Sequence, residues 1–223
     1  KVGWQGVNGL VEYNNSTVSA VLQAGLSNQS FQRIDYFAQP DNPESEKKNV
    51  GGGYLKGGAN YNINEAHNVF FNAGFISRQP NFDGVFPNYA NNVNPDLQNE
   101  EITSVELGYG FVSNNFKANV NLYSTNWGNR FVTRSLSNQQ GVDGFAQFKD
   151  IDVLHNGLEV EGQWRPTMAT KIRGMLSIGD WRYTKDFEAA LFDDTQQQIG
   201  TGTLYLKDAK VGDAAQFVAY LGL

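Results

Sequence analysis

The residues in this chain that could do chemistry are mainly carboxylates and amides, placed at alternate positions of extended segments. Asn119 and Asn121 lie in one such segment, and Glu159 and Glu161 lie in the next. Because every second residue of a strand points to the same face, we expect all four side chains to project from one face of a sheet. They could contact a ligand or another part of the protein. The second interpretation is favoured, because buried polar groups need hydrogen-bond partners.

A second candidate site is the loop at 78–100, which contains Arg78, Phe82, Phe86 and Tyr89. An arginine and several aromatic rings on a long loop suit the recognition of a sugar, a peptide or a chelate. The alternative is that these side chains pack the loop against itself. Both interpretations stay open on the sequence alone.

The sequence predicts no enzyme active site, no metal site and no bound cofactor. His67 and His155 are far apart in sequence and neither belongs to a metal-ligand spacing, so structural or solvent-facing positions are expected for both. There is no nucleophile elbow, and the glycines match no phosphate-binding loop. Asp193 and Asp194 are expected to form a solvated turn.

The composition favours strands and turns over helices. The 223 residues include 24 glycines, 13% aromatic residues and no cysteine, with a formal net charge of −6 at pH 7. The negative charge and the lack of a basic stripe argue against a nucleic-acid partner. The lack of cysteine excludes a disulfide framework and a thiolate metal site. No run of about 18 apolar residues is present, so no transmembrane helix is expected.

The stretch from Glu101 to Trp127 (EITSVELGYGFVSNNFKANVNLYSTNW) predicts a long β-hairpin. Apolar residues alternate with polar residues or glycine over about ten positions on each side of the turn at 112–115. One face is therefore hydrocarbon, whereas the other carries a carboxylate, an ammonium group and two amides. The hydrocarbon face holds Val105, Leu107, Tyr109, Ala118, Val120 and Leu122.

The same alternation recurs along the chain, and the connections alternate in length. Short turns are predicted near 14, 64, 113 and 166, and long connections near 43, 89, 140 (residues 135–147) and 200 (a hairpin within 186–213). Charged residues fall on the face opposite the apolar one: Lys56, Glu106, Lys117, Glu159, Glu161, Lys171 and Arg173. Six aromatic residues near predicted strand ends are expected to form girdles: Trp4, Tyr13, Trp127, Trp164, Trp181 and Tyr183.

Short turns at one end, long loops at the other and alternating strands of about ten residues are typical of an outer-membrane β-barrel. In that interpretation the apolar face meets lipid and the polar face meets the interior. The alternative is a soluble all-β sandwich or barrel, whose strands also alternate. Such strands usually have about five or six residues, and their loops need not alternate in length by side.

Several stretches resemble the C-terminal half of the barrel of TonB-dependent outer-membrane receptors of the Bacteroidetes type. The resemblance covers about 95–223 well and 1–94 more loosely. It rests on five stretches: 95–109 (PDLQNEE, then SVELGY), 118–123 (ANVNLY), 126–130 (NWGNR), 155–166 (HNGLEVE, then WRP) and 177–181 (SIGDW).

This resemblance implies a 22-stranded barrel that an N-terminal plug domain occludes. The expected fold class is therefore all-β, an antiparallel transmembrane β-barrel segment of about nine strands. Residues 1–223 would form part of the barrel domain, and both ends of the sequence read as cut within strands. The plug domain and the terminal strands are not expected within this sequence, and about nine strands are too few to close such a barrel.

The resemblance also implies active uptake of a scarce nutrient across the bacterial outer membrane, with no enzymatic activity. The implied partners are outer-membrane lipid, the protein's own plug domain, the TonB complex acting through that plug, and a nutrient ligand. That ligand would be an iron chelate, a glycan, a peptide or a cobalamin-like molecule. Two alternatives stay open: a passive porin or secretion-type barrel, and a soluble β-rich binding module.

Overall fold

The computed structural model describes residues 1–137, 143–195, 197–212 and 214–223. Its strands belong to one antiparallel sheet. They are β1 (Val2–Asn14), β2 (Val18–Phe31), β3 (Lys48–Asn62), β4 (His67–Arg78), β5 (Glu100–Val112), β6 (Phe116–Ser137), β7 (Asp143–Thr167), β8 (Thr170–Tyr183), β9 (Phe187–Asp193), β10 (Gln198–Leu204) and β11 (Phe217–Gly222). A short helix, α1 (Phe82–Val85), and a 3-10 turn, η1 (Pro87–Tyr89), lie between β4 and β5.

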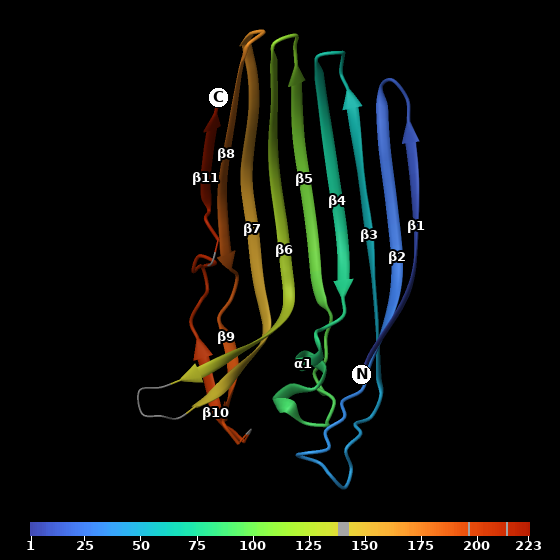
Figure 1. Ribbon diagram of the computed structural model, residues 1–223, viewed down its shortest axis with the longest axis vertical. Helices are drawn as coiled ribbons and strands as arrows, with labels where there is room; N and C mark the ends of the chain where they lie inside the picture. Colours follow the sequence, from blue (N-terminus) through green and yellow to red (C-terminus); the bar gives the residue numbers. More distant parts are fainter. Residues whose placement is uncertain (138–142, 196, 213) are drawn as a thin grey trace.

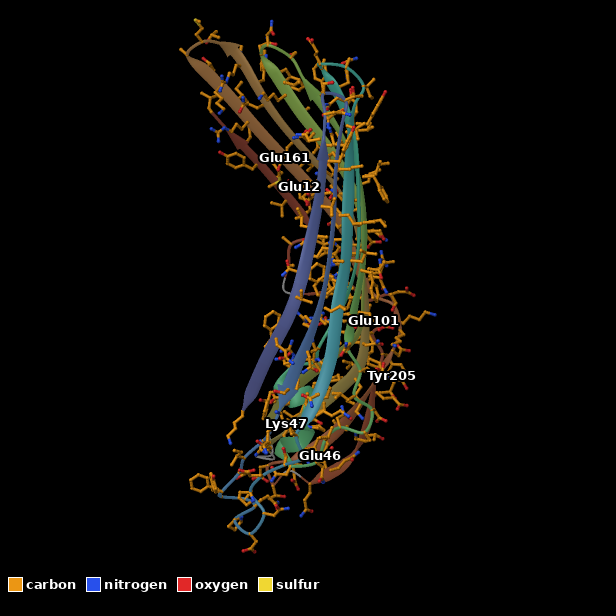
Figure 2. All side chains as sticks on the ribbon, turned by 90° about the vertical axis from the view of Figure 1, so that its right-hand side faces the viewer. Glu12, Glu46, Lys47, Glu101, Glu161 and Tyr205 are labelled. Atoms are coloured by element: carbon orange, nitrogen blue, oxygen red, sulfur yellow. The ribbon has the colours of Figure 1, made fainter. Side chains whose placement is uncertain are left out.

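Nine strands form a continuous path in the order β1-β2-β3-β4-β5-β6-β7-β8-β11, which matches the predicted number of crossings (Figure 1). β1 and β11 are the two edges of this path, so the sheet of this segment is open. Figure 2 shows it from the side, bent into a trough, with Glu161 on the concave side and Glu101 on the convex side. The predicted all-β antiparallel fold is confirmed.

The short turns lie at one end of the sheet and the long connections at the other, as the sequence predicts (Figure 1). Side chains of asparagine close two of these turns. Asn15 Oδ1 accepts hydrogen bonds from the backbone N–H groups of Thr17 and Val18 at 2.8 and 2.7 Å. Asn64 Oδ1 does the same for Ala66 and His67 at 2.9 and 3.0 Å. Such local bonds fix a tight reversal, because they satisfy amides that face no partner strand.

A loop is predicted at 135–147, and this prediction is wrong for 135–137 and 143–147, which belong to strands. Residues 138–142 lie outside the described residues. β6 continues to Ser137 and β7 already begins at Asp143. The start of β7, at 144–148, pairs with β9 instead of β8, and β10 completes this extension beyond the long-loop end. The stacked rings of Phe145 and Phe192, 4.9 Å apart, join β7 to β9. The hairpin predicted within 186–213 is confirmed as β9 and β10.

The convex face is the apolar register that the sequence predicts. Along β5 the residues Val105, Leu107 and Tyr109 are exposed, whereas Gly108 and Gly110, on either side of Tyr109, are buried on the concave side. One row of paired residues follows the convex face through nine strands: Tyr13, Ala20, Ala59, Phe71, Leu107, Leu122, Leu158, Ile178 and Phe217. Every member of this row is hydrocarbon or aromatic. Such a surface suits lipid, where charged side chains are costly.

The girdle prediction is wrong for four of the six aromatic residues. Strand pairing places Trp4, Trp127, Trp181 and Tyr183 in the concave register, whereas Tyr13 and Trp164 lie in the convex register. A group at the short-turn end of the convex face suits the girdle better. It contains His67, Tyr109, Phe111 and Phe116, with the His67 Nδ1 atom 2.5 Å from the Tyr109 hydroxyl. Position near a strand end does not identify a girdle residue, because only the register decides which face a ring occupies.

Among the described residues, no helix is both long enough and apolar enough to cross a membrane.

The assignment of faces makes a prediction about β6. Val120 lies on the convex face and Asn119 beside it on the concave face. In the full-length protein, Val120→Lys should place an ammonium group in lipid, at a cost of about 2–4 kcal/mol. The assembled fraction in the outer membrane, measured by heat-modifiable gel migration, should fall sharply. The matched variant Asn119→Lys should assemble nearly as the parent does, and equal loss from both variants would contradict the assignment.

Candidate functional site

The structure brings the four polar residues of the first candidate site together on the concave face. Asn119 on β6 is directly opposite Glu161 on β7, and Asn121 is directly opposite Glu159. The Ser177 hydroxyl on β8 donates to Glu159 Oε1 at 3.4 Å. Asn121 Oδ1 is buried and accepts no hydrogen bond from the described residues. This wall therefore offers acceptors, including two carboxylates, to whatever fills the concave side.

Two glycines let aromatic rings lie flat on the concave wall. A Cβ atom at Gly108 would overlap the Phe70 ring, and one at Gly157 would overlap the Tyr123 ring. Beside them, Asn72 donates to the Glu106 carboxylate at 2.9 Å. The ring faces cover the backbone between the polar groups, so the wall combines flat apolar patches with hydrogen-bonding groups. This alternation is typical of binding surfaces.

An aromatic column lies on the same face, and it includes Trp127 and Trp181, two of the residues predicted to form girdles. The Trp181 indole donates to the Tyr123 hydroxyl at 3.0 Å, and its ring stacks on His155 with 5.0 Å between centroids. Trp127 lies 6.5 Å from His155 on the other side. His155 Nε2 is buried with no hydrogen-bond partner among the described residues. The sequence alone could not show this column, because the column depends on the register that pairs Thr125 with His155 and His155 with Trp181.

Arg78, a residue of the second candidate site, belongs to a charged group where the wall meets the long connections. Glu100 is its pairing partner across β4 and β5, and the Glu100 carboxylate accepts from the Arg78 guanidinium. The second oxygen of Glu100 lies 3.1 Å from Arg130 Nε, and the Arg130 guanidinium lies over the Trp127 ring at 5.7 Å. The side chain of Glu100 is 8% exposed and that of Arg78 is 59% exposed. The buried Glu100 carboxylate thus pairs with both Arg78 and Arg130 at the long-loop end of the wall, which we call the mouth.

The other loop residues have different surroundings. Phe86 is 2% exposed and forms a small core with Phe31 and Val85, and Phe82 packs against this core. Phe82 and Phe86 therefore pack within the fold, in agreement with the alternative that the loop side chains serve packing and not ligand recognition. Tyr89 lies in η1, and its side chain falls outside the described residues. This small core consequently holds the loop against the concave side of β2.

A second connection, at 32–47, is ordered by a carboxylate. Asp35 accepts hydrogen bonds from the backbone of Ala38 and Phe37 and, at 2.7 Å, from Arg33. The bond from Ala38, followed by that from Arg33, holds the pKa of Asp35 below its ordinary value. Ionised Asp35 therefore stabilises this loop above the unfolded pKa of about 3.9, and the stabilisation is lost as pH falls through the lowered value.

In the part of the chain that the structure describes, no three histidine, cysteine, aspartate or glutamate residues gather in a way that could hold a metal ion. His67 contacts Tyr109 and Phe111 on the convex face, and on the concave face His155 stacks on Trp181 and lies tilted to Trp127. Both histidines are thus part of aromatic packing. The arrangement as a whole can bind by hydrogen bonds, ring faces and charge.

The fold and the two faces define a segment of an antiparallel β-barrel whose apolar side faces outward and whose polar side faces inward. The family described as "TonB dependent receptor-like, beta-barrel" matches residues 12–222. The chain therefore belongs to this family of outer-membrane barrels. The narrower Bacteroidetes type stays a prediction.

Among solved structures, the fold is similar to that of a chain described as "Copper transporter OprC". The TM-score is 0.68 at 11% sequence identity, over 99% of this chain and 40% of that chain. The chain thus spans less than half of that transporter. At this identity the likeness shows the fold alone. No curated protein sequence matches the chain significantly.

The ion group at the mouth gives a prediction that uses two adjacent glutamates. Glu100→Gln should destabilise the folded full-length protein by about 1–2 kcal/mol, because it leaves two guanidinium groups without their shared carboxylate. The estimate lies between the values for exposed and buried pairs, since Arg78 and Arg130 are 59% and 38% exposed. The measurement is the urea midpoint of the refolded protein.

Glu101→Gln is the matched control, because Glu101 is exposed on the convex side and joins no ion pair in the described part of the chain (Figure 2). Its effect should stay below about 0.5 kcal/mol. Equal shifts from the two variants would show that the Arg–Glu–Arg group contributes nothing to stability.

Proposed function

We propose that this chain is a barrel segment of a TonB-dependent outer-membrane receptor that takes up a scarce nutrient actively. Membership of the barrel family over residues 12–222 is the observation that carries the proposal. The concave wall is compatible with it, because it offers carboxylates, amides and ring faces to a domain inside the barrel. The proposal includes no enzymatic step.

Asn119, Asn121, Glu159 and Glu161 are proposed to contact the protein's own plug domain. Glu161 is exposed and Glu159 is half-buried, so both carboxylates can accept hydrogen bonds from an opposing surface or pair with cations on it. A domain that filled the trough would bury these charges, which is costly unless its donors or cations meet them.

Arg78 is proposed to face the nutrient ligand, because its guanidinium is more than half exposed at the mouth. Phe82 and Phe86 would act indirectly, by holding the loop at 79–99 over the wall, and Tyr89 is retained as a ligand-facing candidate on the same loop. The ligand class stays open among an iron chelate, a glycan, a peptide and a cobalamin-like molecule. TonB is proposed to act through the plug.

A genetic test separates this importer from a passive pore. Cells that carry the full-length protein should accumulate its nutrient against a gradient, and deletion of tonB should abolish that accumulation. A plugged barrel closes the passive route, so diffusion should not replace the lost uptake. Uptake that survives the deletion and rises linearly with concentration would identify a porin and overturn the proposal.

A variant pair tests the role of the wall. Glu159→Gln with Glu161→Gln should loosen the plug and raise the passive entry of a large antibiotic several-fold, because two charge-assisted contacts are weakened at about 1–2 kcal/mol each. Glu44→Gln with Glu46→Gln is the matched control, since this pair has the same spacing on an exposed loop. Equal antibiotic sensitivity of the two double variants would remove Glu159 and Glu161 from the plug contact.

A further inference from the structure

Four cationic side chains gather where the concave wall meets the short turns. Lys117 on β6, Gln163 on β7 and Arg173 on β8 form one row of directly paired residues. Lys171 lies two residues before Arg173 on β8, and Arg165 lies two residues after Gln163 on β7. Neighbouring strands are about 4.8 Å apart, and same-face residues two positions along are about 7 Å apart. The four cations therefore surround Gln163 within one small patch.

These cations repel one another. The pairing of β6, β7 and β8 places all four like charges on neighbouring positions of one face. Of the residues that the structure describes, none carries a carboxylate within 4.0 Å of any of the four, whereas six other ion pairs form elsewhere. Glu161 lines the same hollow as Lys117 and Arg173 without such a contact. The patch thus keeps a local charge of about +3 in a chain whose net charge is −6.

The position of the patch limits what can neutralise it. Lys117 and Arg173 belong to the concave register, so they point away from the lipid that meets Val120 and Leu176 on the other face. Lipid phosphates beside the convex face are therefore poorly placed to reach them. A hollow of about 330 Å³, lined by Lys117, Gln163 and Arg173, opens at this patch. Gln163, the uncharged residue between Lys117 and Arg173, can donate hydrogen bonds through its side-chain amide.

We infer that this patch, formed by Lys117, Arg165, Lys171 and Arg173, binds an acidic segment of the plug domain at the short-turn end of the sheet, which is the periplasmic end in outer-membrane barrels. The inference rests on the proposed function, because it takes that domain as the occupant of the trough. Carboxylates are the matching chemistry, since arginine and lysine form short, charge-assisted bonds with them. Two or more acidic residues in one segment would neutralise most of the excess charge. The patch would then tie the plug to β6, β7 and β8 at the end opposite the ligand.

The test uses the full-length protein, purified in detergent, and follows cleavage of its plug by proteinase K. Lys117→Glu with Arg173→Glu should speed this cleavage about fivefold at low ionic strength, because attraction becomes repulsion. Raising NaCl from about 0.05 M to about 1 M should speed cleavage of the parent protein and slow cleavage of this variant, because salt screens attraction and repulsion alike. Lys117→Gln with Arg173→Gln should give an intermediate rate.

Lys47→Glu with Lys48→Glu is the matched control, since it reverses two lysine charges at the long-loop end (Figure 2 labels Lys47). Its cleavage rate should follow that of the parent. Heat-modifiable migration checks that each barrel has assembled, and the glutamine pair gives the answer if the glutamate pair does not assemble. A parent-like rate and salt response in the charge-altered variants would overturn the inference. Absence of any plug from the full-length protein would instead defeat the proposed function, and that result is visible without the variants.

Discussion

The structure depends on the requirement that backbone N–H and C=O groups inside a lipid bilayer find partners within the protein. Each unsatisfied group costs several kcal/mol there, so only helices and closed sheets can cross. The strands β1 to β8, each longer than ten residues, satisfy this requirement by continuous antiparallel pairing, and the shorter β11 pairs with β8. Because the pairing register also fixes which side chains share a face, the same hydrogen bonds separate Val105 and Leu107 from Glu106. The backbone pairing thus determines which side chains face lipid and which face the barrel interior.

The concave face uses this separation to hold groups that lipid would not accept. Its centre carries the acceptors of Asn121, Glu159 and Glu161, and its short-turn end carries a group of cations around Gln163. At its long-loop end a buried carboxylate, Glu100, holds two guanidinium groups. Charge therefore changes sign along the wall, and a domain filling the trough would meet a defined pattern of donors and acceptors. Such a pattern can fix the orientation of that domain as well as its affinity.

Much of this could be predicted from the sequence, because period-two alternation and turn chemistry are local. The apolar register of the Val105 hairpin, the turns at Asn15 and Asn64, and the shared face of Asn119 and Glu161 all follow from spacing. The extension formed by β6, β7, β9 and β10 did not follow. Its pairing joins 144–148 to 189–193 across more than 40 residues, and local composition carries no signal for such a distant partner.

The aromatic residues show the same limit. Trp127, His155 and Trp181 form one column only because three strands are in a particular register, and a shift of one residue would move a ring to the lipid face. Likewise, the sequence assigns Arg78 to a long loop, whereas it is the last residue of β4, and it cannot show that Glu100 joins Arg78 to Arg130. The sequence therefore predicts which residues of one strand share a face, whereas contacts that join three strands can be seen only in the folded structure.

The central claim is that one face of the sheet meets lipid and the other meets the barrel interior. Spin labels placed singly at residues 117–124 of the full-length protein, in native membrane, test it most directly. Accessibility to oxygen, which partitions into lipid, should peak at 118, 120, 122 and 124 with a period of two residues. Accessibility to a water-soluble nickel chelate should be lowest at those same positions. A profile without that period, or nickel accessibility higher at Val120 and Leu122 than at Asn119 and Asn121, would contradict the account.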